Sequence, residues 1–155
     1  MKKQANSLHC FVCGVENDGG LHLNFYEPQP GQVRAEITVP ETFQGYPGVV
    51  HGGVVAAMLD EAAGRTWMGA EEPRFMVTAR LSIRYRRPVP VGEPLVLVGR
   101  AGEDRGRVAT ATGEIYSQDG QLLAEAEVVM ADIPSELTRA FGGEPDGWRV
   151  YPDEE

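Results

Sequence analysis

Apolar and polar residues alternate along most of this chain, with the two-residue period of a half-buried β-strand. The first half holds two such segments, residues 21–27 and 32–39, joined by a turn with two prolines and a glycine. Asp119-Gly120 is a hairpin signal between two of the later strands. Those later strands are expected at residues 76–87, 93–102, 107–117 and 121–131. The pattern therefore predicts an antiparallel sheet of about six strands.

One segment, residues 52–68, departs from this alternation and predicts a long helix that ends at Gly69. Its apolar face consists of Val54, Val55, Met58, Leu59 and Ala62. Its small residues, which allow a sheet to approach closely, are Ala56, Ala57, Ala62, Ala63 and Gly64. A short helical turn is expected at residues 135–141. One long helix against an antiparallel sheet predicts an α+β fold of two layers.

The composition is that of an ordinary globular domain, since 42% of the 155 residues are hydrophobic and 24% are charged. We expect an N-terminal segment at 1–20, one domain at 21–133, and an acidic, solvated tail at 134–155. No apolar run is long enough for a membrane span, and the first residues do not resemble a secretory signal. A cytoplasmic protein with no membrane partner is the expectation.

The net charge of −9 argues against nucleic acid as a partner, because the phosphate backbone requires a basic surface. Basic residues nevertheless gather in one short segment, which would suit an anionic small molecule. They are Arg80, Arg84, Arg86 and Arg87.

The only cysteines, Cys10 and Cys13, form a lone C-x-x-C motif. His9 and His22 are the residues able to complete a zinc site of two cysteines and two histidines. The alternatives are a small turn packed on the domain, or reduced thiols in a reducing compartment. We expect no bound metal, because a zinc site normally shows four well-spaced ligands.

Two adjacent carboxylates in the predicted helix differ in their surroundings. Glu61 precedes Arg65 by four residues, the favourable order for a local ion pair. Asp60 has only alanine and glycine three and four positions away, so its partner must come from outside its own helix. We therefore predict that Asp60 is a functional carboxylate and that Glu61 is structural.

The start of this helix, His51-Gly52-Gly53, offers backbone N–H groups that no helical carbonyl accepts. Without side chains on the glycines, a carbonyl oxygen can approach these donors, as in an oxyanion hole. His51 and Asp60 are roughly 13 Å apart along the axis and about half a turn apart around it. Either the helix start at His51 and the carboxylate of Asp60 have separate functions, or Asp60 of one chain lies next to the helix start of another chain in a symmetric dimer.

These residues form the pattern HGG-x6-D (His51 to Asp60), followed by a strand that ends in Tyr85-Arg86-Arg87-Pro88. With the opening CFVCG…GLHLNFYE, the chain resembles the hotdog-fold acyl-CoA thioesterases of the phenylacetate-pathway and thioesterase-superfamily type over about residues 10–133. The resemblance implies a curved sheet wrapped round one central helix. It also implies hydrolysis of an acyl-CoA by a homodimer, possibly a dimer of dimers, without a cofactor.

The resemblance further implies roles for particular residues. Asp60 is the base or nucleophile, the Gly52 amide polarises the thioester carbonyl with His51 and Gly53 beside it, and Thr78 helps to place water. Those family members carry Asn where this chain has Gly45, and Gln44 is the nearest amide. The residues that could contact CoA phosphates are Arg84, Arg86 and Arg87. The residues that could shape an acyl pocket are Met58, Trp67, Phe75 and Met76.

Two rival functions use the same fold. A hydroxyacyl-thioester dehydratase would carry a histidine in a motif resembling H-F-P-G before the helix, where this chain has FQGYPG at 43–48. A non-catalytic acyl-CoA sensor would carry a basic DNA-binding segment, and would not require Asp60. The sequence favours hydrolysis over both.

Overall fold

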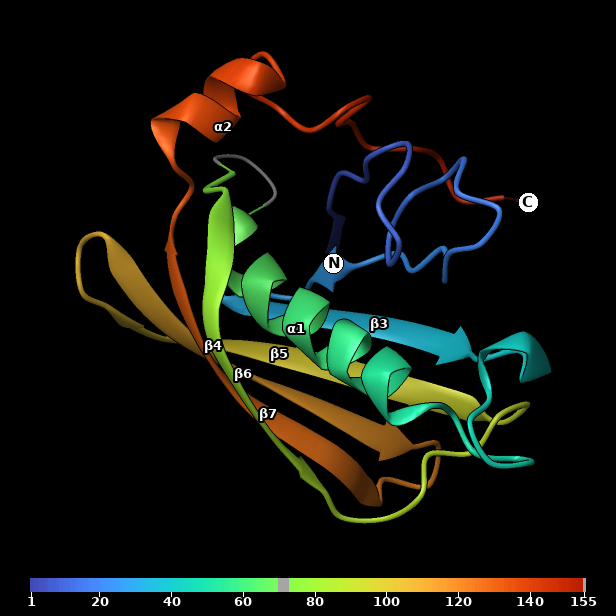
Figure 1. Ribbon diagram of the computed structural model, residues 1–155. Helices are drawn as coiled ribbons and strands as arrows, with labels where there is room; N and C mark the ends of the chain where they lie inside the picture. The colour runs from blue at the N-terminus through green and yellow to red at the C-terminus, as the bar shows by residue number, and fades with distance from the viewer. Residues whose placement is uncertain (70–72, 155) are drawn as a thin grey trace.

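A single antiparallel sheet curves round one long helix, α1 (Gly52–Met68), in the computed structural model (Figure 1). The structure describes residues 1–69 and 73–154, so Ala70, Glu71, Glu72 and Glu155 lie outside it. Within these ranges the sheet has seven strands in the order β1-β2-β3-β5-β6-β7-β4. The bounds are β1 (Lys2–Lys3), β2 (Tyr26–Glu27), β3 (Gln32–Thr38), β4 (Met76–Tyr85), β5 (Pro94–Asp104), β6 (Val108–Ser117) and β7 (Leu122–Asp132). The predicted α+β hotdog architecture is confirmed.

The predicted helix has the expected bounds, and Gly69 ends it with a positive φ of 59°. Two short helices complete the described elements, η1 (Glu41–Phe43) and α2 (Ser135–Ala140). No helix in the described ranges has the length and apolar character that crossing a bilayer demands.

The expected strand at 21–27 is wrong for most of its length, because only Tyr26–Glu27 pair within the sheet. The alternation itself is real, since Leu21, Leu23 and Phe25 are buried. Their backbone pairs instead with the N-terminal segment, for example from Leu21 N–H to Phe11 C=O at 2.9 Å. That segment also supplies β1, so the sheet has seven strands rather than about six.

The sheet approaches α1 closely at two glycines, Gly99 on β5 and Gly113 on β6. A Cβ at Gly99 would lie 2.2 Å from the carbonyl oxygen of Ala62, and a Cβ at Gly113 would lie 2.8 Å from that of Leu59. Both distances are shorter than a van der Waals contact. The close approach expected from small helix residues therefore also requires glycines on the sheet.

Substituting Gly99→Ala is expected to lower the free energy of unfolding by about 1–3 kcal/mol, because the added methyl group would press on helix backbone that cannot easily move. Urea unfolding would measure this as a lower midpoint at an unchanged slope. Gly19→Ala is the matched control, since its Cβ would meet nothing closer than 3.5 Å. Equal midpoints for the two variants would contradict the role assigned to Gly99.

The C-terminal segment is mostly exposed, but its central part packs on the domain. The backbones of Asn6 and Arg149 exchange two hydrogen bonds, of 2.9 and 3.1 Å. In Figure 1 the N-terminal and C-terminal segments run on the same side of the molecule, above α1, and the bridge between Asn6 and Arg149 joins them. The Trp148 ring packs edge-to-face on Phe75, with centroids 5.4 Å apart. This tryptophan anchors a segment whose acidic composition alone suggested a free tail.

Arg65 of α1 is fully buried between the two ends of the chain. Its guanidinium carbon lies 5.0 Å from the ring centroids of both Phe25 and Trp148. Its Nη1 donates a hydrogen bond to the carbonyl of Ala5 at 2.5 Å. The cation thus contacts the N-terminal segment at Ala5, the segment before β2 at Phe25 and the C-terminal segment at Trp148.

Candidate functional site

The start of α1 leaves one backbone donor free. His51 is the N-cap, and its Nδ1 accepts a hydrogen bond from the Gly53 N–H at 2.9 Å. The carbonyl of His51 accepts from the N–H groups of Val54 and Val55. No described residue accepts a hydrogen bond from the Gly52 N–H. Of the two glycine amides expected to bind a carbonyl oxygen, Gly52 is therefore the one available to a ligand.

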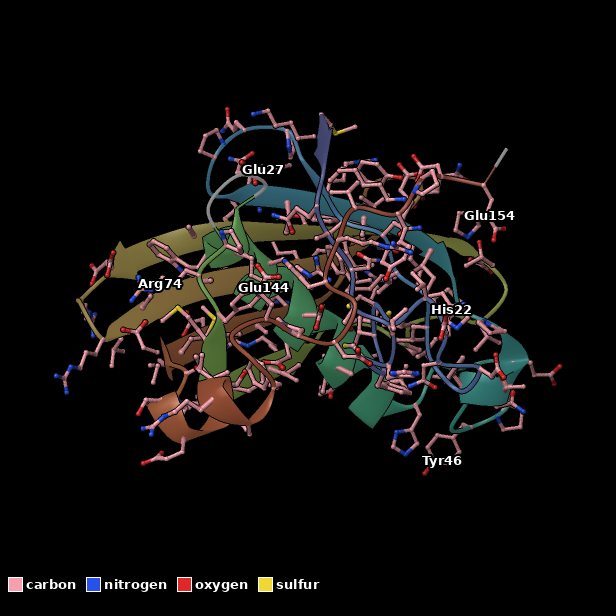
Figure 2. All side chains as sticks on the ribbon, turned by 90° about the horizontal axis from the view of Figure 1, so that it is seen from above. His22, Glu27, Tyr46, Arg74, Glu144 and Glu154 are labelled. Carbon is pink, nitrogen blue, oxygen red and sulfur yellow. The ribbon has the colours of Figure 1, made fainter. Side chains whose placement is uncertain are left out.

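This free amide faces an open groove of about 740 Å³, which we call the Gly52 groove. The Tyr85 hydroxyl donates to the Gly52 carbonyl at 2.7 Å and so joins β4 to the start of the helix. Tyr46, labelled in Figure 2, extends outward from the preceding loop and is 83% exposed. The residues that line the groove are Gly45, Tyr46, Val49, Val50, His51, Gly52, Val55, Tyr85, Arg86, Arg87, Pro88 and Val89.

The predicted phosphate-binding residues differ in position. Arg86 and Arg87 line the Gly52 groove, but Arg86 is already paired with Glu125 at 2.9 Å. Arg84 lies on β4 opposite Glu125 and lines a different surface hollow. Proximity to Arg86 and Arg84 lowers the pKa of Glu125. Arg87 is thus the predicted arginine that lies at the groove without an ion pair among the described residues.

Gln44, the nearest amide to the position where related proteins carry Asn, is occupied elsewhere. Its Oε1 accepts a hydrogen bond from the Gly48 N–H at 3.2 Å. It does not line the Gly52 groove, whereas Gly45 does. The side chain of Gln44 therefore shapes the loop before α1.

The hydrogen-bond partner of Asp60 comes from outside its own helix, as predicted from the alanine and glycine residues that surround Asp60 on the helix. Thr78 Oγ1 on β4 donates a hydrogen bond to Asp60 Oδ1 at 2.6 Å. Asp60 is half-buried, so its second oxygen can reach a ligand. The structure thus brings together the two residues that the resemblance named for base and water placement.

Asp60 and Thr78 line a second hollow of about 270 Å³, which we call the Asp60 cavity. Phe75 and Met76, predicted to shape an acyl pocket, do line it. Met58 is instead buried in the core, and the Trp67 indole donates to the carbonyl of Thr110. The other large apolar residues of the cavity are Met68, Met130, Ile133, Phe141 and Trp148. Sequence reasoning missed Phe141 and Trp148, for which the only signal was aromatic residues in an otherwise polar tail.

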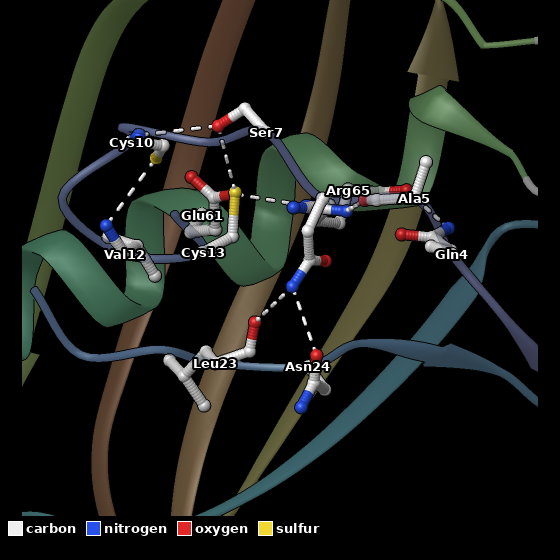
Figure 3. A network of polar contacts seen from close by, with 11 residues as sticks. Gln4, Ala5, Ser7, Cys10, Val12, Cys13, Leu23, Asn24, Glu61 and Arg65 are labelled. Carbon is white, nitrogen blue, oxygen red and sulfur yellow. Dashed lines mark hydrogen bonds and ion pairs between the residues drawn. The ribbon is translucent and has the colours of Figure 1, made fainter. Parts of the chain in front are cut away.

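A polar network forms one wall of the Asp60 cavity (Figure 3). The predicted ion pair between Glu61 and Arg65 is present, with Nε 2.9 Å from Oε1. Cys10 and Cys13, which are both free thiols, lie against this pair. A hydrogen bond from Cys13 lowers the pKa of Cys10 to about 6, and the same bond, together with burial, raises the pKa of Cys13. Burial raises the pKa of Glu61 to about 7, although Arg65 opposes this shift.

The two histidines expected as partners of these cysteines lie elsewhere. His9 Nδ1 is 2.9 Å from Asp146 Oδ2, and His22 Nε2 contacts the carbonyl of Asn17 at 2.5 Å. A site of two cysteines and two histidines is therefore absent from the described residues.

The Gly52 groove and the Asp60 cavity are separate within one chain. They share no lining residue, and Gly52 and Asp60 are about 12 Å apart along the helix axis. β4, which carries Thr78, is the last strand of the sheet, so one of its edges has no neighbour in the described ranges. Within the described ranges, a single chain therefore presents two separate hollows and, at β4, an open sheet edge.

This combination of a curved antiparallel sheet and one central helix that opens on glycines is that of the hotdog fold. The chain belongs to the thioesterase superfamily, whose family model matches residues 47–124.

Named relatives agree with this membership. The chain is 35% identical over 141 residues to the acyl-coenzyme A thioesterase THEM4 of Rattus norvegicus, a match that covers 88% of this chain and 60% of that protein. A solved thioesterase superfamily protein is 36% identical with a TM-score of 0.73, covering 79% of this chain and 63% of that one. A Streptococcus mutans protein bound to acetyl CoA is 22% identical with a TM-score of 0.65, covering 72% and 88%, and shows the fold alone. The chain thus spans about three-fifths of the rat relative.

Proposed function

We propose that this protein hydrolyses an acyl-CoA thioester to a free acid and CoA. The observation that carries the proposal is Asp60, a half-buried carboxylate that accepts a hydrogen bond from Thr78 and lines a largely apolar cavity. The free Gly52 N–H at the N-terminus of α1 can donate a hydrogen bond to the thioester carbonyl oxygen and so polarise the carbonyl group. Similarity to the rat acyl-coenzyme A thioesterase supports CoA thioesters as the substrate class.

The mechanism divides the reaction between these two groups. The thioester carbonyl oxygen accepts a hydrogen bond from the Gly52 N–H, and the helix dipole stabilises the negative charge that develops on it. Asp60 either activates a water molecule or attacks the carbonyl carbon directly, and Thr78 orients its carboxylate. The tetrahedral intermediate then collapses, and CoA leaves as its thiolate. In the water route the acid forms in this step, and the proton that Asp60 removed from water passes to the thiolate. In the direct attack the acyl group stays on Asp60 as a mixed anhydride, which a water molecule then hydrolyses to the free acid.

We assign the two halves of each site to two chains of a homodimer, which either stands alone or forms half of a dimer of dimers. The separation of Gly52 and Asp60 within one chain supports this arrangement. The open edge of β4 offers a surface for symmetric strand pairing beside Thr78. Arg87, together with the neighbouring Arg86, would then contact the phosphates of CoA in the Gly52 groove.

We also propose a cytoplasmic location for the protein, because its two cysteines, Cys10 and Cys13, are free thiols.

Thiol release from a panel of acyl-CoAs, from acetyl to palmitoyl and including phenylacetyl, tests the proposal. We expect hydrolysis of at least one member at a rate well above the background. Loss of the enoyl absorbance of crotonyl-CoA without thiol release would instead identify a dehydratase. Binding of the panel without either reaction would identify a sensor, and both of these outcomes would reject hydrolysis.

Mixed dimers test whether two chains share each site. A chain with Asp60→Asn and a chain with Gly52→Pro, each defective alone, are unfolded together and refolded at equal concentrations. If sites are shared, half of the dimers are mixed and each holds one intact site, so about a quarter of the wild-type rate returns. No recovery, with dimer formation verified by light scattering, would place both groups in one chain.

A further inference from the structure

The Cys10–Cys13 segment forms a tight turn that presents both sulfur atoms to α1 (Figure 3). The Val12 N–H donates to Cys10 Sγ at 3.4 Å, and the Gly14 N–H donates to the Cys10 carbonyl at 2.8 Å. A Cβ at Gly14 would lie 2.4 Å from that carbonyl oxygen, so this turn requires glycine. The Val12 N–H, which is directed at the Cys10 sulfur, stabilises the thiolate, which is the form that ligates metals.

Glu61 brings a third ligand from a different element. The two Sγ atoms and a carboxylate oxygen of Glu61 all lie within 4.8 Å of one another. With Zn–S bonds of about 2.3 Å, tetrahedral ligands stand roughly 3.8 Å apart, so only small side-chain rotations are needed to close the site. Arg65 bonds Glu61 Oε1, and no described residue donates to Oε2.

The charges in this cluster favour a divalent cation. Ionised Cys10, Cys13 and Glu61 would carry three negative charges, of which the buried Arg65 guanidinium balances one. A dication balances the other two, which leaves a neutral cluster in which Cys13 is buried and Cys10 and Glu61 are partly exposed. Two thiolates with one carboxylate select zinc over magnesium or calcium, which prefer oxygen ligands.

We propose that Cys10, Cys13 and Glu61 bind one zinc ion, with a solvent molecule as its fourth ligand. All three residues line the Asp60 cavity, so the ion would fasten the N-terminal segment to α1 next to Asp60. The earlier expectation of four protein ligands applies to structural sites, whereas three protein ligands and a solvent position are typical of open ones. The inference does not depend on thioesterase activity.

Cobalt(II) provides the probe, because thiolate ligands give it an intense near-ultraviolet charge-transfer band and tetrahedral geometry gives it strong visible bands. Reduced, chelator-treated protein is titrated with cobalt chloride, and zinc chloride is then added. We expect both bands to saturate at one cobalt per chain and to disappear on displacement by zinc. Zinc at a hundredfold excess over its Kd should also raise Tm by about 5–10 °C.

Variants of the full chain identify the ligands. Cys10→Ser and Cys13→Ser are expected to abolish the charge-transfer band or weaken cobalt binding by about 100-fold or more, and Glu61→Gln to weaken it by about 10–100-fold. His9→Ala and His22→Ala are the matched controls and should bind as the wild type does, because neither histidine faces the cluster. Circular dichroism identifies any variant that fails to fold. If a variant fails to fold, the cobalt titration of the wild-type protein decides whether the metal site exists.

Three results would overturn the proposal. The first is reduced wild-type protein that shows no charge-transfer band and no rise in Tm with zinc. The second is loss of binding in the histidine variants with retention in the cysteine variants. The third is a purified protein in which Cys10 and Cys13 form a disulfide that resists reduction under native conditions. None of these measurements uses acyl-CoA, so a failed thioesterase assay and a failed metal site remain distinguishable.

Discussion

Replacing Asp60 by Asn is expected to lower kcat for acyl-CoA hydrolysis by about 10³-fold or more, with little change in KM. Asn has nearly the same shape, and its Oδ1 can still accept the hydrogen bond from Thr78. What is lost is the negative charge that either removes a proton from water or attacks the carbonyl. A well-placed general base alone contributes about 10²–10⁴-fold, and a covalent nucleophile contributes at least as much.

Steady-state thiol release with the best acyl-CoA of the panel measures this effect. Asp18→Asn removes an equal charge from an exposed N-terminal loop and serves as the matched control, with full activity expected. If Asp60→Asn retained more than a tenth of the wild-type kcat, Asp60 would not be the base or the nucleophile.

Gly52→Pro is expected to lower kcat by about 10²–10³-fold while leaving the fold intact. Gly52 is the first residue of α1, a position where proline is well tolerated because its missing N–H makes no helical hydrogen bond. His51 has φ −54° and ψ 135°, the extended conformation that a residue before proline prefers. The substitution therefore removes the proposed carbonyl-binding donor and little else.

Gly52→Ala provides the control for Gly52→Pro, because it keeps the N–H. Its Cβ would lie 3.6 Å from the Tyr85 hydroxyl, an ordinary contact, so we expect most of the wild-type rate. Circular dichroism and Tm should be alike for the three proteins. Equal losses in the alanine and proline variants would point to crowding of the groove rather than to a missing donor.

Local patterns were enough to predict the helix and most of the sheet. The helix ends at a glycine, and the burial of β5 and β6 alternates clearly from residue to residue. The ion pair of Glu61 and Arg65 followed from their spacing alone. The isolation of Asp60 within its helix correctly predicted an outside partner, but only the family resemblance singled out Thr78, because no spacing relates a helix residue to a strand eighteen residues later.

Contacts between distant segments could not be predicted in this way. The aromatic packing of Trp148 on Phe75 joins segments whose sequences carry no shared pattern. In the sequence, His9 and His22 are the nearest candidate partners of the two cysteines, whereas the neighbour of the cysteines in space is Glu61, about fifty residues away. Glu61 had already been explained by Arg65, so nothing in the sequence indicated a second set of neighbours.

Arg65 has a consequence for how the domain opens. Its guanidinium is held by Phe25 on one side and Trp148 on the other, with the Ala5 carbonyl as a hydrogen-bond acceptor. Releasing either end of the chain would leave a buried cation short of partners, which is costly. The two ends should therefore detach as one cooperative unit, and the Asp60 cavity, which both of them help to enclose, should open in the same step.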